Sequence, residues 1–425
     1  MDAQKNRIVK KNTLVLLARE TLNKGTLFIL LILIGRMLGK EALGRYSLAL
    51  AISSIFFFGT EFGLNTLAIR EIAKNKFIAG KFLVTMGALR VIMGVVTMGL
   101  IAVTSAVLGA HGETATVIYL CAFSYFLVNI TSLYTSVFRA FEKMEFELGI
   151  AVIKIVIFLP AALWILKSGG GLIPIFIIFF IANVISFIVA HLIFLDKIAQ
   201  PLWIFDLNFC RKQLAHTSWV WLSQLFGIAY LKIAPLLLFR MKGEGAVGVY
   251  NAAFVVVDGF WMMGGCFIAA IFPVISRLHE ISVQRVSREY LNGLRFICIC
   301  LVPIGIVLVL TCSSFLPVIY GQKFTGVAPV FTLLTGAALL IVLDGLSGFV
   351  LVAIGRQHVL PIINAAVLSI NLALNFLLIG RYGPAGSAYA LLISEICAFA
   401  MIMAAMHRFI LLPARPQHLH RAVDA

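Results

Sequence analysis

Twelve long apolar stretches dominate the sequence, and each has the length of a membrane-spanning helix. A helix needs about 20 mainly apolar residues to cross the hydrocarbon core of a bilayer, whereas barrel strands are about half as long and alternate in hydrophobicity. Because only helices and closed barrels satisfy their backbone hydrogen bonds in lipid, the sequence predicts an all-α polytopic membrane protein of about twelve transmembrane helices. The expected spans lie near 13–35, 44–69, 82–108, 115–138, 147–167, 172–195, 215–239, 246–275, 292–316, 327–354, 360–380 and 385–411.

Composition supports this class and excludes several others. The chain is 61% hydrophobic and 12% charged, whereas soluble domains carry about 25% charged residues. A net charge of +16 does not indicate nucleic acid binding, because the basic residues lie mainly in loops between apolar stretches. The cysteines lie mostly inside apolar stretches and show no CxxC spacing, so we expect neither a disulfide framework nor a metal or redox site. The first stretch lacks a small-residue cleavage site, so we expect it to remain as an anchor.

The loops predict the orientation of the spans. About 20 Lys and Arg residues fall on the side that includes the amino terminus, and about eight fall on the other side. The richer side is expected to be the cytoplasm. Because the number of spans is even, both termini are expected there, in the inner (cytoplasmic) membrane of the cell.

The chain is expected to divide into two halves. The longest inner connection, 196–214, separates six spans in residues 1–195 from six in residues 215–425, which end in a short basic tail. A short internal echo supports the division, since Gly39, Gly44 and Tyr46 match Gly243, Gly248 and Tyr250 at one constant offset. Equal topology in both halves indicates a parallel repeat.

Charged residues inside the spans are the main candidates for function, because each costs roughly 3 kcal/mol in lipid unless it is paired or hydrated. Most belong to different spans, so we expect them to converge on a shared interior. The basic set is expected to form a cationic cavity that binds an anionic substrate: Arg19, Lys24, Arg90, Lys154 and Lys232. The acidic set supplies candidates for binding a coupling ion: Glu61, Asp258, Asp344 and Glu395.

The first span leaves two readings open. Glu20 precedes Lys24 by four residues, in the order that favours a local ion pair on a helix. In that structural reading Arg19 lies near the cytoplasmic interface. In the functional reading Arg19 and Lys24 belong to the cationic wall.

Polar side chains recur along one face of several spans. A single stripe of this kind is compatible with hydrogen bonds between neighbouring helices, but stripes in both halves favour a hydrated cavity. The expected polar residues of that cavity are Asn23, Asn129, Gln224 and Asn371. The sequence has no GxSxG, HExxH or Walker A motif, so we expect no enzyme, no cofactor and no ATP hydrolysis by the chain itself.

Residues 35–74 carry a family resemblance. They include Leu-Gly-x-Glu-x-x-Gly-x-Tyr at Leu38–Tyr46, Phe-Gly-Leu at Phe62–Leu64 and Ile-Arg-Glu at Ile69–Glu71. This pattern resembles the polysaccharide (O-antigen or exopolysaccharide) repeat-unit flippases of the multidrug/oligosaccharidyl-lipid/polysaccharide exporter superfamily. The motifs cover about a tenth of the chain, while length, span count and the six-plus-six layout agree throughout.

The resemblance implies two six-helix lobes around a central cavity. It also implies that the substrate is an undecaprenyl-pyrophosphate-linked oligosaccharide, moved to the outer leaflet by alternating access. Relatives that flip the peptidoglycan precursor carry functional basic residues in the first helix, in places comparable to Arg19 and Lys24. Those relatives usually have two further helices, which this sequence lacks, so the peptidoglycan substrate is disfavoured.

Two other functions were weighed. A cation-coupled multidrug or small-solute exporter of the same superfamily is the alternative, and an acid-dominated cavity would favour it. A glycosyltransferase or ligase is disfavoured because no expected outer loop exceeds about 12 residues. The partners that the leading reading implies are membrane lipids, a polysaccharide polymerase, a chain-length regulator and H+ or Na+ as coupling ion.

Overall fold

The computed structural model describes residues 2–198, 218–279, 283–321, 324 and 326–408. Within these residues the chain forms α-helices, two 3-10 turns and no strand. In chain order the elements are α1 (Asp2–Gly59), α2 (Leu64–Lys74), η1 (Lys76–Ile78), α3 (Ala79–Leu108), α4 (Gly112–Ala140), α5 (Met144–Lys167), α6 (Leu172–Lys197), α8 (Ser218–Lys242), α9 (Glu244–His279), α10 (Val283–Tyr320), α11 (Val327–Ala353), η2 (Gln357–Val359), α12 (Leu360–Tyr382) and α13 (Pro384–Met406).

The all-α polytopic class is confirmed. Ten of the helices in the described part of the chain, α3 to α6 and α8 to α13, contain a stretch long and apolar enough to cross a membrane. Most helix ends lie within a few residues of the expected spans; α6, for example, ends at Lys197 and α13 begins at Pro384.

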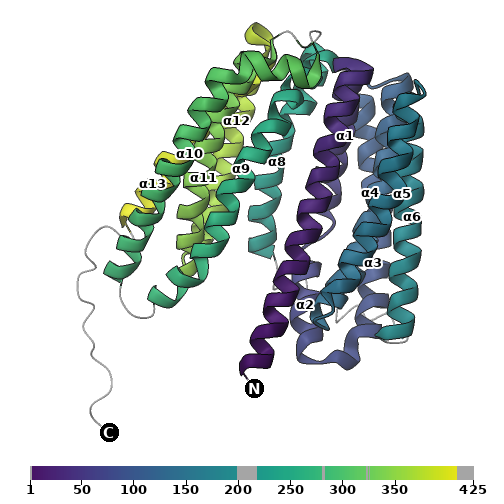
Figure 1. The fold of residues 1–425 in the computed structure, drawn as a ribbon, viewed down its shortest axis with the longest axis vertical. Coiled ribbons are helices and arrows are strands. Elements are labelled where there is room, and N and C mark those ends of the chain that lie inside the picture. The colour runs from purple at the N-terminus through teal and green to yellow at the C-terminus, as the bar shows by residue number, and fades with distance from the viewer. Residues whose placement is uncertain (1, 199–217, 280–282, 322–323, 325, 409–425) are drawn as a thin grey trace.

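The first expected span and most of the second lie in α1, which is bent at Gly39. Gly39 has φ of +90°, outside the helical region, and residues without a Cβ adopt this conformation at little steric cost. The helix therefore consists of two segments, 2–38 and 40–59. Figure 1 shows α2 at the same end of the bundle as the amino terminus, so the second segment runs back toward that end.

The second expected span, 44–69, was wrong in its last third. Helix α1 ends at Gly59, residues 60–63 form a turn, and α2 starts at Leu64. Phe62 and Gly63 have φ of 45° and 69°, which ends the regular helix. The short helix α2 is not among the candidate membrane spans.

Helices α1 to α6 form one group and α8 to α13 form another, and the two diverge toward the end that carries the amino terminus (Figure 1). We call this the inner end, and the end with the turns at Gly39, Gly243 and Gly383 the outer end. A continuous core of buried apolar side chains includes residues from both groups. The predicted linker 196–214 lies, from residue 199 onward, outside the described residues.

The internal echo corresponds to matching local structure. Gly243 turns the chain between α8 and α9 with φ of +80°, as Gly39 does in α1 with +90°. Tyr46 and Tyr250 are both buried, at 3% and 2% exposure. The matched residues therefore hold equivalent positions in the two halves.

Candidate functional site

A cavity of about 330 Å³ lies between the two groups of helices. Both segments of α1 contribute to its wall, and α8 and α9 supply the rest. Its size falls in the range of about 300–1,000 Å³ that is usual for ligand pockets. Its polar lining residues are Thr21, Lys24, Ser47, Lys232, Tyr250, Asn251 and Asp258.

Two of the five predicted cations meet in this interlobe cavity. Lys24 enters from the first half of the chain and Lys232 from the second. The Nζ atom of Lys232 lies 5.2 Å from the centre of the Phe254 ring, and Asp258 interacts with it electrostatically. Within the described part of the chain, neither lysine has a carboxylate oxygen within the 4.0 Å of an ion pair. Both ammonium groups are therefore available to an anion.

Arg19 lies in a separate ion-pair cluster of the first half. Its guanidinium is 2.6 Å from a Glu20 oxygen and 3.0 Å from a Glu147 oxygen. Glu147 is 1% exposed and also accepts two bonds from Arg139, at 2.8 and 2.6 Å. The structural reading of a Glu20–Lys24 pair is thus replaced by a Glu20–Arg19 pair. Arg19 is compensated inside the protein.

Lys154 of α5 lies near this cluster. It interacts electrostatically with Arg19 and with Glu20. It lines neither the interlobe cavity nor the larger cavity of the second half described below, and Asn23 likewise lines neither. The structure therefore does not join Lys154 to Lys24 and Lys232.

Arg90 has internal partners only, among the residues described. It is 1% exposed and donates to the backbone oxygen of Asn129, to Ser132 Oγ at 2.7 Å and to Asn65 Oδ1 at 2.7 Å. Asn129 in turn donates its side-chain N–H to the carbonyl of Phe57, at 3.2 Å. Buried polar groups usually find such partners. The network ties α2, α3 and α4 to the end of α1, where the helix breaks.

Glu61 follows that break directly. It is half-buried and interacts electrostatically with Arg90. It lines neither of the two cavities. The structure therefore links Glu61 to the Arg90 network rather than to the interlobe lysines.

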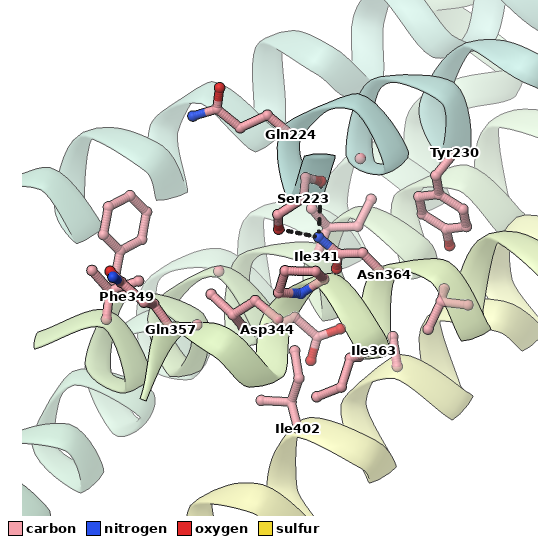
Figure 2. A pocket seen from close by; sticks show the side chains of 18 of the residues that line it. Ser223, Gln224, Tyr230, Ile341, Asp344, Phe349, Gln357, Ile363, Asn364 and Ile402 are labelled. Atoms are coloured by element: carbon pink, nitrogen blue, oxygen red, sulfur yellow. Dashed lines mark hydrogen bonds between the residues drawn. The ribbon is translucent and has the colours of Figure 1, made fainter. Parts of the chain in front are cut away.

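A larger cavity, of about 690 Å³, lies inside the second half of the chain. Helices α8, α11, α12 and α13 surround it, and Asp344 and Glu395 are its charged lining residues. Figure 2 shows the side-chain N–H of Asn364 pointing at Ser223, to whose hydroxyl it donates a hydrogen bond at 3.1 Å. Its other polar lining residues are Gln224, Tyr230, Gln357 and His358.

The two carboxyl groups of this cavity are buried. Asp344 and Glu395 are 8% and 4% exposed and interact with each other. Both carboxylate oxygens of Asp344 are buried without a geometrically defined hydrogen bond among the described residues. Isolated buried charges are costly, so a bound cation or proton would stabilise this site.

A hydrogen-bond network lies behind the acidic pair. The hydroxyls of Tyr230 and Ser394 form a hydrogen bond of 2.9 Å. The side-chain N–H of Asn371 donates to the Ser394 hydroxyl at 3.0 Å. Asn375 donates to Asn371 at 2.9 Å and accepts from Ser387 at 2.6 Å. Asn371 is 2% exposed. Its side chain therefore joins α12 to α13 rather than facing open space.

The sequence did not predict several residues that line these cavities or join the two halves. Tyr230 lies two residues before Lys232 in the same span, and Asn251 and Tyr250 follow the echo glycine Gly248. Their closeness in sequence to predicted residues was the one feature from which they could have been found. Arg45, at the start of the second expected span, bridges the two halves by an ion pair to Glu244 at 2.6 Å.

Known proteins place this architecture in a family. The model of the polysaccharide biosynthesis protein family matches residues 9–279. The teichuronic acid biosynthesis protein TuaB of Bacillus subtilis is 26% identical over 37% of this chain and 32% of its own length. The lipopolysaccharide biosynthesis protein WzxC of Escherichia coli is 23% identical over 38% of this chain and 33% of its own length. The chain thus spans about a third of these relatives.

The fold is also found in a solved transporter. The lipid II flippase MurJ, in an inward closed conformation, superposes with a TM-score of 0.73 over 93% of this chain and 87% of its own, at 13% identity. This similarity concerns the fold alone. With the family model matching well over half of its length, this multi-pass membrane protein belongs to the polysaccharide biosynthesis protein family.

Proposed function

We propose that the chain moves an undecaprenyl-pyrophosphate-linked oligosaccharide from the inner to the outer leaflet by alternating access. The observation that carries this proposal is the pair Lys24 and Lys232, which line one interlobe cavity from the two halves. Among the described residues neither has an ion-pair partner. A pyrophosphate is strongly anionic, and its transfer through hydrocarbon without compensation is prohibitive. Two ammonium groups on opposite walls would compensate that charge in a site that both lobes share.

The comparisons support the substrate class. The relatives TuaB and WzxC are named for the biosynthesis of teichuronic acid and lipopolysaccharide. MurJ, which shares the fold, is named a lipid II flippase. These names agree with a substrate that combines a lipid carrier, a phosphate group and sugars.

The cavity would hold only the charged part of such a substrate. Its 330 Å³ accommodates a pyrophosphate with the adjoining atoms, and the remaining sugars would extend toward the inner end. Leu17 of α1, which lies nearer the inner end than Lys24, is 53% exposed. Leu27, which lies beside Lys24 in the same helix, is 40% exposed. An apolar surface of this kind would let the lipid tail stay in the bilayer.

We further propose that the protein lies in the inner (cytoplasmic) membrane with both termini in the cytoplasm. The positive-inside distribution of Lys and Arg supports this orientation. A polysaccharide polymerase and a chain-length regulator are the proposed partners, because they would use the translocated repeat unit.

Deletion of the gene tests the proposal. We expect loss of the surface polymer and accumulation of the lipid-linked repeat unit in the inner leaflet, measured by glycan staining and by analysis of the lipid carrier. Wild-type protein and the Lys11→Ala variant should restore the polymer, while Lys24→Ala and Lys232→Ala should not, although they reach the membrane. Full polymer with Lys24→Ala and Lys232→Ala combined would contradict the proposal.

The cavity of the second half favours a second candidate function. It contains Asp344 and Glu395 and no Lys or Arg among its lining residues, which suits a cation rather than a pyrophosphate. Export of a small cationic solute, coupled to H+ or Na+, would use this site. Raised sensitivity to cationic drugs in the deletion strain, with normal surface polymer, would select this function over the first.

A further inference from the structure

The backbones of the two halves approach each other closely at two glycines of the internal echo. A Cβ atom on Gly44 would overlap the carbonyl oxygen of Glu244, and a Cβ atom on Gly248 would overlap the carbonyl oxygen of Lys40. Glu244 precedes Gly248 by four residues, and Lys40 precedes Gly44 by four. The contact is therefore reciprocal, with each glycine packed on the turn before the other.

Such a contact requires glycine on both sides, because helix backbones approach this closely only where no side chain separates them. Both glycines lie just after the turns at Gly39 and Gly243, at the outer end of the bundle. One helical turn further inward, Ser47 on α1 and Asn251 on α9 line the interlobe cavity. The glycine pair thus lies directly between this cavity and the outer end.

Polar side chains fasten the same contact. Arg45, the residue after Gly44, pairs with Glu244 at 2.6 Å and also with Glu113 of α4. Thr114 of α4 donates to Glu244 as well. Arg45 is 27% exposed and Glu113 is 39% exposed, so water reaches this ionic contact and can replace its bonds.

We propose that the Gly44–Gly248 contact, with the ion pair of Arg45 and Glu244, is the releasable seal that closes the interlobe cavity toward the outer side. This proposal concerns the regulation of access to that cavity and rests on the proposed transport by alternating access. Opening to the outer side separates α1 from α9 at the glycines and breaks the ion pair. Any side chain at either glycine holds the two helices apart.

Cysteine accessibility tests the seal without any substrate. The reporter is Ser47→Cys in a background whose seven native cysteines are replaced, and the probe is a membrane-impermeant maleimide applied to membranes of each orientation. Without further change, the reporter should react from the inner side and not from the outer side. With Gly44→Ala or Gly248→Ala, outer labelling should rise several-fold.

The reciprocal contact also predicts how the two glycine variants combine. Because either methyl group alone separates the same two helices, the double variant should label no more than each single variant. Gly99→Ala is the matched control, since Gly99 lies in helix α3 and nothing lies within 4 Å of its added Cβ. It should label like the unchanged reporter protein.

The ion pair offers a test that adds no bulk in the helix contact. Arg45→Glu should also raise outer labelling, and combining it with Glu244→Arg should lower it again. Unchanged outer labelling in Gly44→Ala, Gly248→Ala and Arg45→Glu would overturn the proposal. Should the glycine variants fail to reach the membrane, the Arg45→Glu result decides alone. If the variants change outer labelling as expected but Lys24→Ala leaves the surface glycan unchanged, the seal stands and only the proposed substrate is overturned.

Discussion

Trp221 of α8 donates its indole N–H to the backbone carbonyl of Phe58, at 3.3 Å. The same carbonyl also accepts the backbone N–H of Glu61, at 3.1 Å, in the turn that follows the end of α1 at Gly59. The Trp221 ring also stacks on Phe62, with ring centres 4.4 Å apart. The break in the second span therefore provides one of the contacts through which the second half of the chain binds the first.

The Trp221 contact predicts a graded loss of stability. Trp221→Phe keeps the stacking and loses one hydrogen bond, a cost of about 1 kcal/mol. Trp221→Ala loses both and should cost about 3 kcal/mol. Thermal unfolding of the purified protein in detergent should give the order wild type, Trp221→Phe, Trp221→Ala.

Trp164 provides the matched control for that series. It is 71% exposed, on the surface that a membrane would cover, so Trp164→Ala should leave the unfolding temperature of the protein unchanged. Equal unfolding temperatures for Trp164→Ala and Trp221→Ala would show that Trp221 does not hold the halves together.

Arg90 is predicted to act in folding rather than in substrate binding. Arg90→Ala removes the donor of three hydrogen bonds and leaves Asn65 and the Asn129 carbonyl without it. Losing three hydrogen bonds from a charged donor in a buried network is costly, and we expect the stability of the protein to fall by about 3 kcal/mol. The amount of folded protein in the membrane and its unfolding temperature should both fall. A fully stable Arg90→Ala protein that exports no glycan would instead indicate a binding role.

Glu147 is predicted to be the anchor of the ion-pair cluster. Its removal leaves Arg19 and Arg139 without their shared buried carboxylate, and breaking a buried pair costs about 3–5 kcal/mol. Glu147→Ala should therefore unfold at a clearly lower temperature. Glu145→Ala is the control, because Glu145 is 42% exposed and pairs only with Lys11 on the surface among the described residues. Similar losses in the two variants would refute the anchor role.

Asp344 is predicted to carry function at the expense of stability. Its two buried oxygens face the Glu395 carboxyl group and have no basic ion-pair partner among the described residues, so Asp344→Asn removes a charge that the fold does not compensate. The variant should unfold at a temperature equal to or above that of the wild type and should lose ion-dependent transport. Lower stability with normal transport would contradict a site for a coupling ion.

The sequence predicts the helices well because membrane spans carry their own signal in length and hydropathy. The break at 60–63 was not predicted from the sequence, since apolar residues continue up to Phe58 and resume at Leu64. Gly59 and Gly63 on either side of the turn were the available signal. Local residue type can place a turn, but it does not show where a long apolar segment stops being one helix.

The sequence alone could not predict which intramembrane charges pair with each other. Arg19 and Glu147 belong to spans that are far apart in the chain, as do Lys24 and Lys232. The cost of a charge in lipid predicts that each residue needs compensation, but not which partner supplies it. The structure separates Arg19 and Arg90, which protein groups compensate, from Lys24 and Lys232. Those two lysines line the interlobe cavity and have no ion-pair partner among the described residues.

The proposed binding of a lipid-linked pyrophosphate in the interlobe cavity depends on Lys24 and Lys232. Its most direct test is the binding of a purified polyprenyl-pyrophosphate-linked oligosaccharide to the purified protein in detergent. We expect saturable binding that weakens with added salt, that is retained in Lys11→Ala, and that is lost when Lys24→Ala and Lys232→Ala are combined. Undiminished binding by that double variant, or equal binding of a neutral lipid-linked sugar, would contradict the account.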